Sequence, residues 1–248
     1  LIAVGIAIAL GWRGSFIALA IPTIILGIVL YFFLGRWGFT RKVNKETPNA
    51  PAGTPYTPTR LRRLITFTVL GVALQALIFS TVSFIPLFVV DTFLVSEAVG
   101  AGLLSLAHFA GLFAGPVGGF LSDRFGKVPV LLVVSLIAGP AIFLLSQASL
   151  NWSIWLVVLA MGTCQYIGMP VSEAYIISHT SERNRSTILG IYYFASRGGP
   201  GIIMPALGYL IDRFGFRTSF TAVGAVMLAV TLVCSVFLWG SRDGPLPE

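Results

Sequence analysis

Long apolar runs alternate with short polar connectors along most of the chain, and this pattern predicts α-helices that cross a membrane. A helix needs about 20 residues to cross the hydrocarbon core of a bilayer. The first run of roughly this length is 16–34. Further runs follow at 64–90, 99–121, 128–148, 154–177, 187–211 and 220–239. The expected fold is therefore all-α, a polytopic membrane helical bundle.

The shortest charged connector joins the runs 99–121 and 128–148. It lies in the stretch GFLSDRFGK, residues 119–127, whose charged residues are Asp123, Arg124 and Lys127. Charge is costly in hydrocarbon, so these side chains are expected in water or among lipid headgroups. The two runs therefore form an antiparallel hairpin of membrane spans.

Positive charge is distributed unevenly between the two ends of the predicted spans. The segment 36–63 is rich in Arg, Lys and Pro, which is typical of an extended linker. Most of the 16 basic residues fall on the side of this segment, whereas Arg13, Arg213 and Arg217 fall on the other. Basic connectors face the cytoplasm in membrane proteins. We therefore expect a cytoplasmic linker and C-terminus, in a protein of the plasma membrane.

Composition agrees with this topology and excludes other classes of protein. Hydrophobic residues make up 56% of the chain and charged residues 10%, whereas soluble domains carry about 25% charged residues. The net charge of +7 is explained by the basic connectors, so no nucleic-acid partner is expected. Cys164 and Cys234 lie in apolar runs, and His108 and His179 lie at different depths, which argues against a metal site. No enzyme signature occurs, so we expect neither catalysis nor a cofactor.

The connector at 119–127 resembles the signature loop of the major facilitator superfamily of secondary transporters. Gly119, Asp123, Arg124, Gly126 and Lys127 match its G-x-x-x-D-R-x-G-K pattern, while Val128 replaces the second basic residue often found there. The stretch 182–190, with Arg183 and Arg185, is similar to the family's loop before the second-last span. In this family the Asp latches one span against another, which implies a contact near the helix that is expected to begin at Thr187.

An internal repeat supports the resemblance. Residues 11–16, GWRGSF, are similar to residues 215–220, GFRTSF, and both stretches precede a last span before a cytoplasmic segment. Family members consist of two six-span halves joined by a linker. We expect the end of an N-terminal bundle at 1–35, with a partial and a full span, and the linker at 36–63. A complete six-span bundle would occupy 64–240 and a cytoplasmic tail 241–248. The rest of the N-terminal half is expected as a missing partner, because the chain starts inside an apolar run.

Two charged residues inside predicted spans are candidates for substrate binding. Arg197 lies ten residues after Thr187, about 15 Å along a helix. Glu173 lies near the cytoplasmic end of the preceding span. An ionisable group at such depth is a functional candidate by default. Either the two residues form an ion pair, or Arg197 binds a charged substrate while Glu173 titrates.

Polar residues at similar depth complete the candidate substrate site. Gln75 can orient a polar substrate, and His108 can carry a proton or serve as a neutral hydrogen-bonded group. Gln165, Met169 and Glu173 share one helix face at spacings of four, with Tyr166 beside them. That face fits either a cavity wall or a packed interface.

Small residues predict close helix contacts in the span 99–121. Gly111, Gly115 and Gly119 recur every four residues, which gives a smooth face for another helix.

The overall expectation is transport of a small polar or anionic molecule by alternating access, with a proton as candidate coupling ion. The alternative is a sensor or receptor that does not transport and uses the same scaffold.

Overall fold

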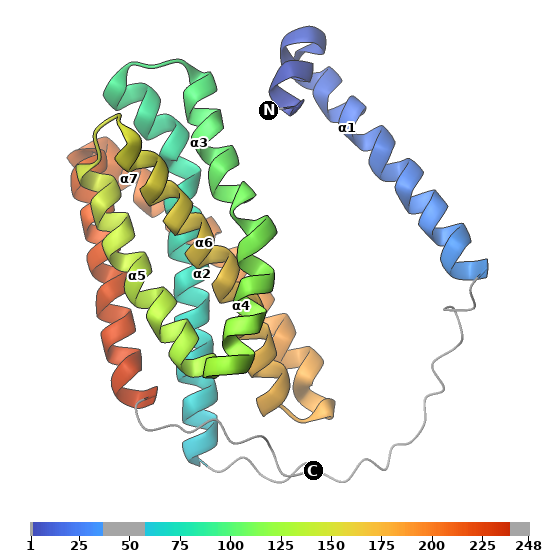
Figure 1. Ribbon diagram of the computed structural model, residues 1–248, viewed down its shortest axis with the longest axis vertical. Coiled ribbons are helices and arrows are strands. Elements are labelled where there is room, and N and C mark those ends of the chain that lie inside the picture. The colour runs from blue at the N-terminus through green and yellow to red at the C-terminus, as the bar shows by residue number, and fades with distance from the viewer. Residues whose placement is uncertain (1, 37–57, 239–248) are drawn as a thin grey trace. The chain divides into compact units, whose positions relative to one another are not determined.

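The computed structural model describes residues 2–36 and 58–238, which belong to two compact units, Leu1–Ala52 and Gly53–Glu248. The first unit is described by the helix α1 (Ile2–Arg36), whose segment Phe16–Phe33 is long and apolar enough to cross a membrane. The stretch 11–16, expected as a loop, is helical, although α1 bends near its N-terminal end (Figure 1). Most of the predicted linker, 37–57, and the predicted tail lie outside the described residues.

The second unit is a bundle of helices. Its helices are α2 (Pro58–Phe93), α3 (Glu97–Phe109), α4 (Gly111–Phe125), α5 (Lys127–Gln147), α6 (Trp152–His179) and α7 (Glu182–Leu238). Six helical stretches of the described ranges, α1 included, are long and apolar enough to cross a membrane. The predicted all-α membrane bundle is confirmed, since a helix satisfies its own backbone hydrogen bonds in lipid.

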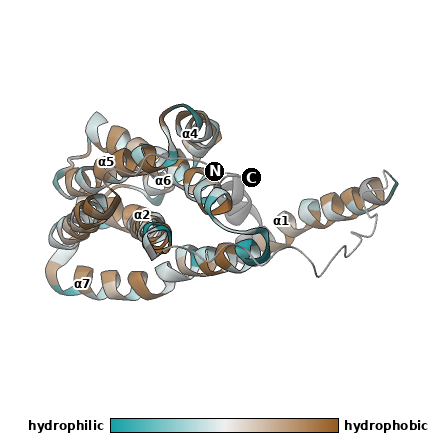
Figure 2. Ribbon diagram, turned by 90° about the horizontal axis from the view of Figure 1, so that it is seen from below, coloured by the Kyte–Doolittle hydropathy of each residue, from teal (hydrophilic) through white to brown (hydrophobic). Residues whose placement is uncertain are grey.

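Large apolar side chains cover the outer surface of the second unit. Phe194 is 81% exposed, Ile202 80% and Val236 73%. Figure 2 shows that hydrophobic residues make up much of the helices, including α5 and α7. A water-soluble monomer rarely exposes a continuous apolar surface of this kind. A lipid environment accounts for it, because the hydrocarbon solvates these side chains.

Two glycines with positive φ mark the sharp reversals of the chain. Gly126 has φ 90° and joins α4 directly to α5, which confirms the predicted hairpin with a one-residue turn. Gly215 has φ 77° and ψ 167° and divides α7 into two helices. The turn between them is therefore this one residue, whereas the sequence predicted a loop at 212–219. Glycine adopts these angles readily because it lacks a Cβ atom. The hydroxyl of Ser219 donates to the Gly215 carbonyl at 2.8 Å, which supports the second reversal.

The predicted span 99–121 contains a break that its hydropathy does not reveal. Helix α3 ends at Phe109 and α4 begins at Gly111, with Ala110 between them.

Helix α7 also differs from the prediction, because it begins at Glu182, more than one turn before Thr187.

Connectors alternate between two ends of the bundle. At one end, the Arg62 guanidinium lies over the Phe237 ring at 5.2 Å, and Lys127 Nζ donates to Ser178 Oγ at 2.9 Å. At the other end, the rings of Phe88 and Phe216 lie 5.4 Å apart. Figure 1 shows the same order, with the α4–α5 turn opposite the α2–α3 and α5–α6 connections. The helices of this unit therefore run up and down in the order that the sequence predicts.

Close contact between α4 and α6 depends on a different helix face from the predicted one. A Cβ atom at Gly118 would lie 2.9 Å from the Cα of Ile167, and one at Gly111 would lie 2.8 Å from the Tyr166 ring. Gly115 and Gly119 have open space beside them. Among the described residues, only Gly111 of the predicted stripe lies at this contact, because the packed face follows the helical spacing from Gly111 to Gly118.

Candidate functional site

Two predicted site residues meet between α2 and α6. The Nε2 of Gln75 donates to the backbone carbonyl of Gln165 at 2.7 Å, and both side chains are 7% exposed. A buried amide of this kind is stable only when it is hydrogen-bonded. The bond fixes the side chain of Gln75 at the interior face of the bundle.

Gln75 lines a small cavity between α2 and α7. The other lining residues are Phe79, Ser196, Arg197 and Pro200, and the volume is about 40 Å³. Cavities that hold small-molecule ligands measure about 300–1,000 Å³. The space inside this bundle therefore suits water, and a larger ligand would need an additional wall.

Arg197 carries a positive charge that has only a weak partner in the bundle. Its side chain is exposed, and Nη2 contacts Met169 Sδ at 3.5 Å. A thioether is a weak hydrogen-bond acceptor and carries no charge. The ion pair with Glu173, one of the two alternatives, is not formed in the part of the chain that the structure describes. The guanidinium is thus available to an anion.

Glu173 lies one turn from Met169 on α6 and is partly buried. Its Oε1 atom is buried and has no hydrogen-bond partner. Tyr193, one turn before Arg197 on α7, interacts electrostatically with both Glu173 and Arg197. The cluster therefore combines an acid, a base and a phenol on two facing helices.

Two further hydroxyl groups lie beside this cluster. Ser172 and Tyr192 are buried, and both approach Gly71 of α2: a Cβ atom there would lie 2.6 Å from Ser172 Oγ and 3.6 Å from Tyr192 Cε2. Tyr192 and Ser196 share one face of α7, as Tyr193 and Arg197 share the next. This spacing of four residues was the signal in the sequence that could have identified Ser196.

The structure places His108 and Tyr166 in a second group. His108 on α3 is exposed, and its Nδ1 bonds the Leu104 carbonyl at 2.8 Å. Its ring lies 6.4 Å from that of Tyr166, which packs on Gly111. Both residues therefore lie at the α3–α4 break, where α6 crosses it.

The residues of the signature loop lie at the end of the bundle where α2 begins. Gly119, Asp123 and Arg124 belong to α4, and both charged side chains are exposed. Lys127 is bonded to Ser178, as described above. Within the described ranges no ion pair joins Asp123 to a basic residue, so the latch stays a prediction.

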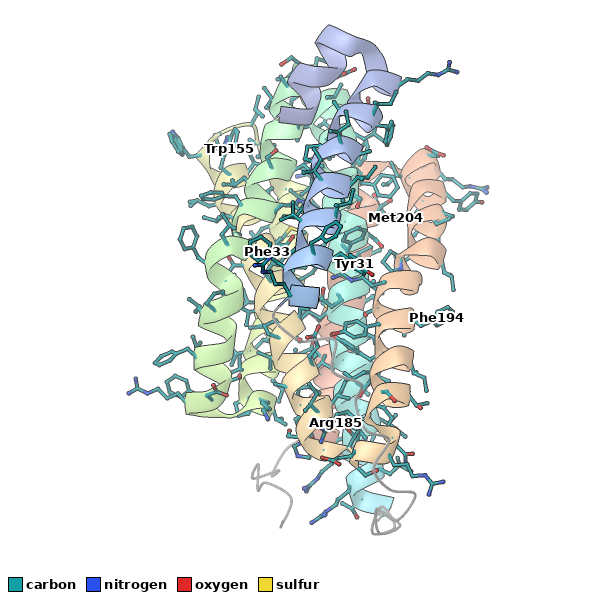
Figure 3. The ribbon with its side chains drawn as sticks, turned by 90° about the vertical axis from the view of Figure 1, so that its right-hand side faces the viewer. Tyr31, Phe33, Trp155, Arg185, Phe194 and Met204 are labelled. Carbon is teal, nitrogen blue, oxygen red and sulfur yellow. The ribbon has the colours of Figure 1, made fainter. Side chains whose placement is uncertain are left out.

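The basic pair at the start of α7 lies at the same end. Arg183 is exposed, whereas Arg185 is partly buried with its Nε lacking a hydrogen-bond partner. Figure 3 shows Arg185 at the end of the bundle where α2 begins. The cationic groups of two connectors therefore gather at one membrane face.

Comparison with known proteins places the whole chain in one family. Residues 1–165 and 99–248 match the sequence model of the Major Facilitator Superfamily. The chain is similar to the probable sulfoacetate transporter SauU of Cupriavidus necator, with 28% identity over 60% of the chain and 36% of the relative. It is also similar to the multi-drug resistance efflux pump PmrA of Streptococcus pneumoniae, with 25% identity over 63% of the chain and 40% of the relative.

Two further matches extend the comparison. The probable nitrate/nitrite antiporter NarK1 of Thermus thermophilus is 26% identical over 69% of the chain and 32% of the relative. A crystal structure of a D-xylose-proton symporter matches with a TM-score of 0.52 and 18% identity, over 75% of the chain and 48% of the symporter. The chain spans about a third of the length of the curated relatives it matches. The structural match supports the fold.

Proposed function

Because the chain belongs to the Major Facilitator Superfamily, we propose that it forms part of a secondary transporter that moves a small anionic molecule by alternating access. The chain is an integral membrane protein, and the curated relatives described above bear the names of transporters. No observation favours the sensor alternative. The proposal places the protein in the plasma membrane with the segment 36–63 and the C-terminus in the cytoplasm.

The environment of Arg197 is the main observation that supports an anionic substrate. Its guanidinium is exposed on a membrane-spanning helix and contacts a neutral sulfur atom. A guanidinium without a counter-charge is costly inside a membrane, and an anionic ligand would offset that cost. Two relatives are named for anions, sulfoacetate and nitrate or nitrite, which supports this choice.

The substrate cavity in this proposal includes the space between α2 and α7. The space beside Gln75 and Arg197 is about 40 Å³, too small for most metabolites. A wall beyond the residues of this unit would complete the cavity for a larger substrate. Gln75 and Gln165 would orient the substrate there, with His108 and Tyr166 lining the cavity at the α3–α4 break.

Glu173 is the proposed site of proton coupling. Its Oε1 atom is buried without a hydrogen-bond partner, and a buried carboxylate of this kind is a candidate functional group in a membrane span. The proton symporter among the structural matches is compatible with such coupling.

Uptake assays on the full-length protein test the substrate proposal. Proteoliposomes would be screened with labelled small anions, including sulfoacetate and nitrate, and with neutral and cationic compounds of similar size. For an anion that is transported, Arg197→Ala is expected to reduce kcat/KM at least tenfold, since a charge-assisted hydrogen bond contributes about 1.5–3 kcal/mol.

Arg213→Ala is the matched control, because Arg213 is exposed on the same helix and donates to Tyr209. Its kcat/KM should equal that of the wild type. Equal uptake by the two variants would remove Arg197 from the substrate site. Transport of cations alone would refute the anionic class.

A further inference from the structure

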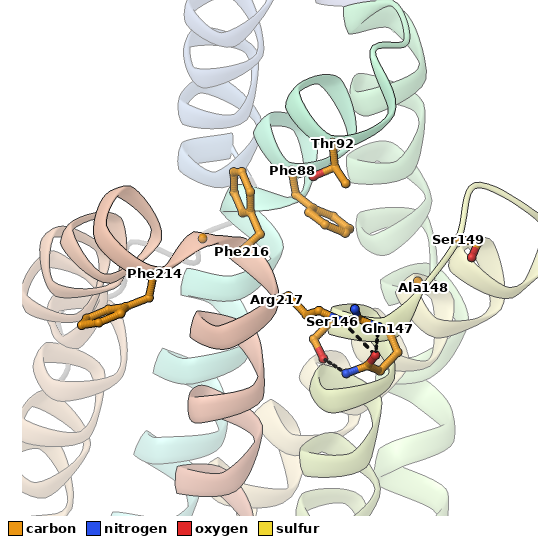
Figure 4. A pocket seen from close by; sticks show the side chains of 10 residues that line it. Phe88, Thr92, Ser146, Gln147, Ala148, Ser149, Phe214, Phe216 and Arg217 are labelled. Atoms are coloured by element: carbon orange, nitrogen blue, oxygen red, sulfur yellow. Dashed lines mark hydrogen bonds between the residues drawn. The ribbon is translucent and has the colours of Figure 1, made fainter.

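A larger cavity lies at the end of the bundle opposite the Gly126 turn. Its volume is about 420 Å³, and α2, α5 and α7 line it where α7 reverses (Figure 4). One wall is aromatic, with Phe88 and Phe216, and the rim is polar, with Ser149, Gln147 and Arg217. The cavity therefore presents apolar and cationic surfaces side by side.

Arg217 is held in place by neutral groups only. Its Nε donates to Gln147 Oε1 at 2.9 Å, and Nη2 donates to the same oxygen. Gln147 in turn bonds Ser146 at 3.3 Å, whose hydroxyl lies 3.0 Å from that of Thr221. Among the described residues no carboxylate pairs with Arg217. The guanidinium is thus positioned by a fixed network while its charge is uncompensated.

The charge of Arg217 is also unusual for its place in the topology. Positive residues are enriched at the other end of the spans, and the positive-inside rule gives no reason for one here. Arg217 and Gln147 are exposed, and Phe214 on the cavity edge is 57% exposed. The cavity therefore opens at the surface of the bundle, beyond the apolar parts of the helices that line it.

We propose that this cavity binds the headgroup of an anionic phospholipid in the leaflet opposite the Gly126 turn. The phosphodiester would accept hydrogen bonds from Arg217 and Ser149, and the rings of Phe88 and Phe216 would contact the glycerol backbone and the first acyl carbons. A soluble anion would use the guanidinium but not the aromatic wall, which favours a lipid. The proposal goes beyond substrate transport and does not depend on Arg197.

Lipid titration of the purified full-length protein tests this site. Short-chain phosphatidylglycerol is expected to raise the thermal unfolding midpoint more than phosphatidylcholine of equal chain length, because a ligand that binds the native state stabilises it. Arg217→Gln should weaken the apparent affinity for phosphatidylglycerol about tenfold. Arg213→Gln, which changes the same charge outside the cavity, should bind phosphatidylglycerol like the wild type.

A second variant keeps the test valid if Arg217→Gln does not fold. Gln147→Glu preserves the acceptor for Arg217 and neutralises its charge, so it should fold and lose the preference for phosphatidylglycerol. Equal stabilisation of wild type and Gln147→Glu by this lipid would overturn the proposal. So would equal stabilisation by soluble glycerol phosphate at the same concentration, which would identify a soluble anion as the ligand.

Discussion

Arg197 and Glu173 lie on neighbouring helices and carry opposite charges, yet the structure does not pair them. Arg197 contacts Met169, while Glu173 keeps one buried oxygen without a partner. Tyr193 lies within electrostatic range of both. A ligand that binds a charged side chain more strongly than its present partner does can replace that partner, because the difference in affinity shifts the equilibrium. At the residue scale, the cluster fits a site that binds and releases an anion.

Removing the carboxyl group of Glu173 should separate transport from proton coupling. We expect Glu173→Gln to retain exchange of labelled for unlabelled substrate but to lose accumulation driven by a pH gradient, because the amide cannot carry the proton. Both rates would be measured in the same proteoliposomes, with Glu97→Gln on the exposed start of α3 as control. Accumulation by Glu173→Gln that equals the wild type would exclude Glu173 as the coupling group.

Helix packing in this bundle depends on small residues at contact points. Gly118 allows α4 to approach the backbone of α6, and Gly71 allows α2 to approach Ser172 and Tyr192. Close packing drives helix association in membranes, because lipid tails are as apolar as the side chains. At the scale of elements, these glycines determine which faces of α2, α4 and α6 line the interior.

Two alanine substitutions on α4 test this packing. Gly118→Ala should lower the thermal unfolding midpoint of the full-length protein, since its Cβ would lie 2.9 Å from the Cα of Ile167. Overpacking of this kind costs about 1–3 kcal/mol. Gly115→Ala meets open space and should be neutral or stabilising, because alanine favours a helix over glycine by roughly 0.5–1 kcal/mol. Equal midpoints for the two variants would contradict the close contact between α4 and α6.

The two ends of the bundle differ in their chemistry. The end with the Gly126 turn gathers Arg124, Lys127 and Arg185, whereas the opposite end carries the aromatic cavity beside Arg217. Alternating access needs contacts that form at one end and break at the other as two bundles rock. At the scale of the whole molecule, the charged end carries the residues of the predicted latch between spans.

Asp123 is the residue for which this latch can be tested. Asp123→Asn should reduce transport severalfold with unchanged membrane insertion, because it removes the charge that would hold one state closed. Initial uptake rates and surface abundance would be measured together. Asp91→Asn, exposed at the opposite end of the bundle, is the control and should transport like the wild type. Wild-type flux in Asp123→Asn would mean that its carboxylate does not act as a latch.

The sequence by itself determined the membrane topology of the second unit. The run 128–148 became α5 (Lys127–Gln147) almost without change, and the hairpin at Gly126 formed where the charged connector predicted it. Hydropathy predicts spans because each residue contributes its own free energy of transfer into lipid, whatever its tertiary contacts. The same pattern predicted Gln75 and Arg197 within spans, and both lie in helices that are long and apolar enough to cross a membrane.

Only the tertiary structure decided which side chains meet. The bond from Gln75 to the Gln165 carbonyl, the contact of Arg197 with Met169 in place of Glu173, and the packing of Gly118 in place of Gly115 all depend on how neighbouring helices are rotated. The break between α3 and α4 at Ala110 could not be predicted from hydropathy either, because the run stays apolar there. The rotation of a helix and its distance from a neighbour depend on how the faces of both helices fit together. The pattern of apolar residues along one helix describes only its own face.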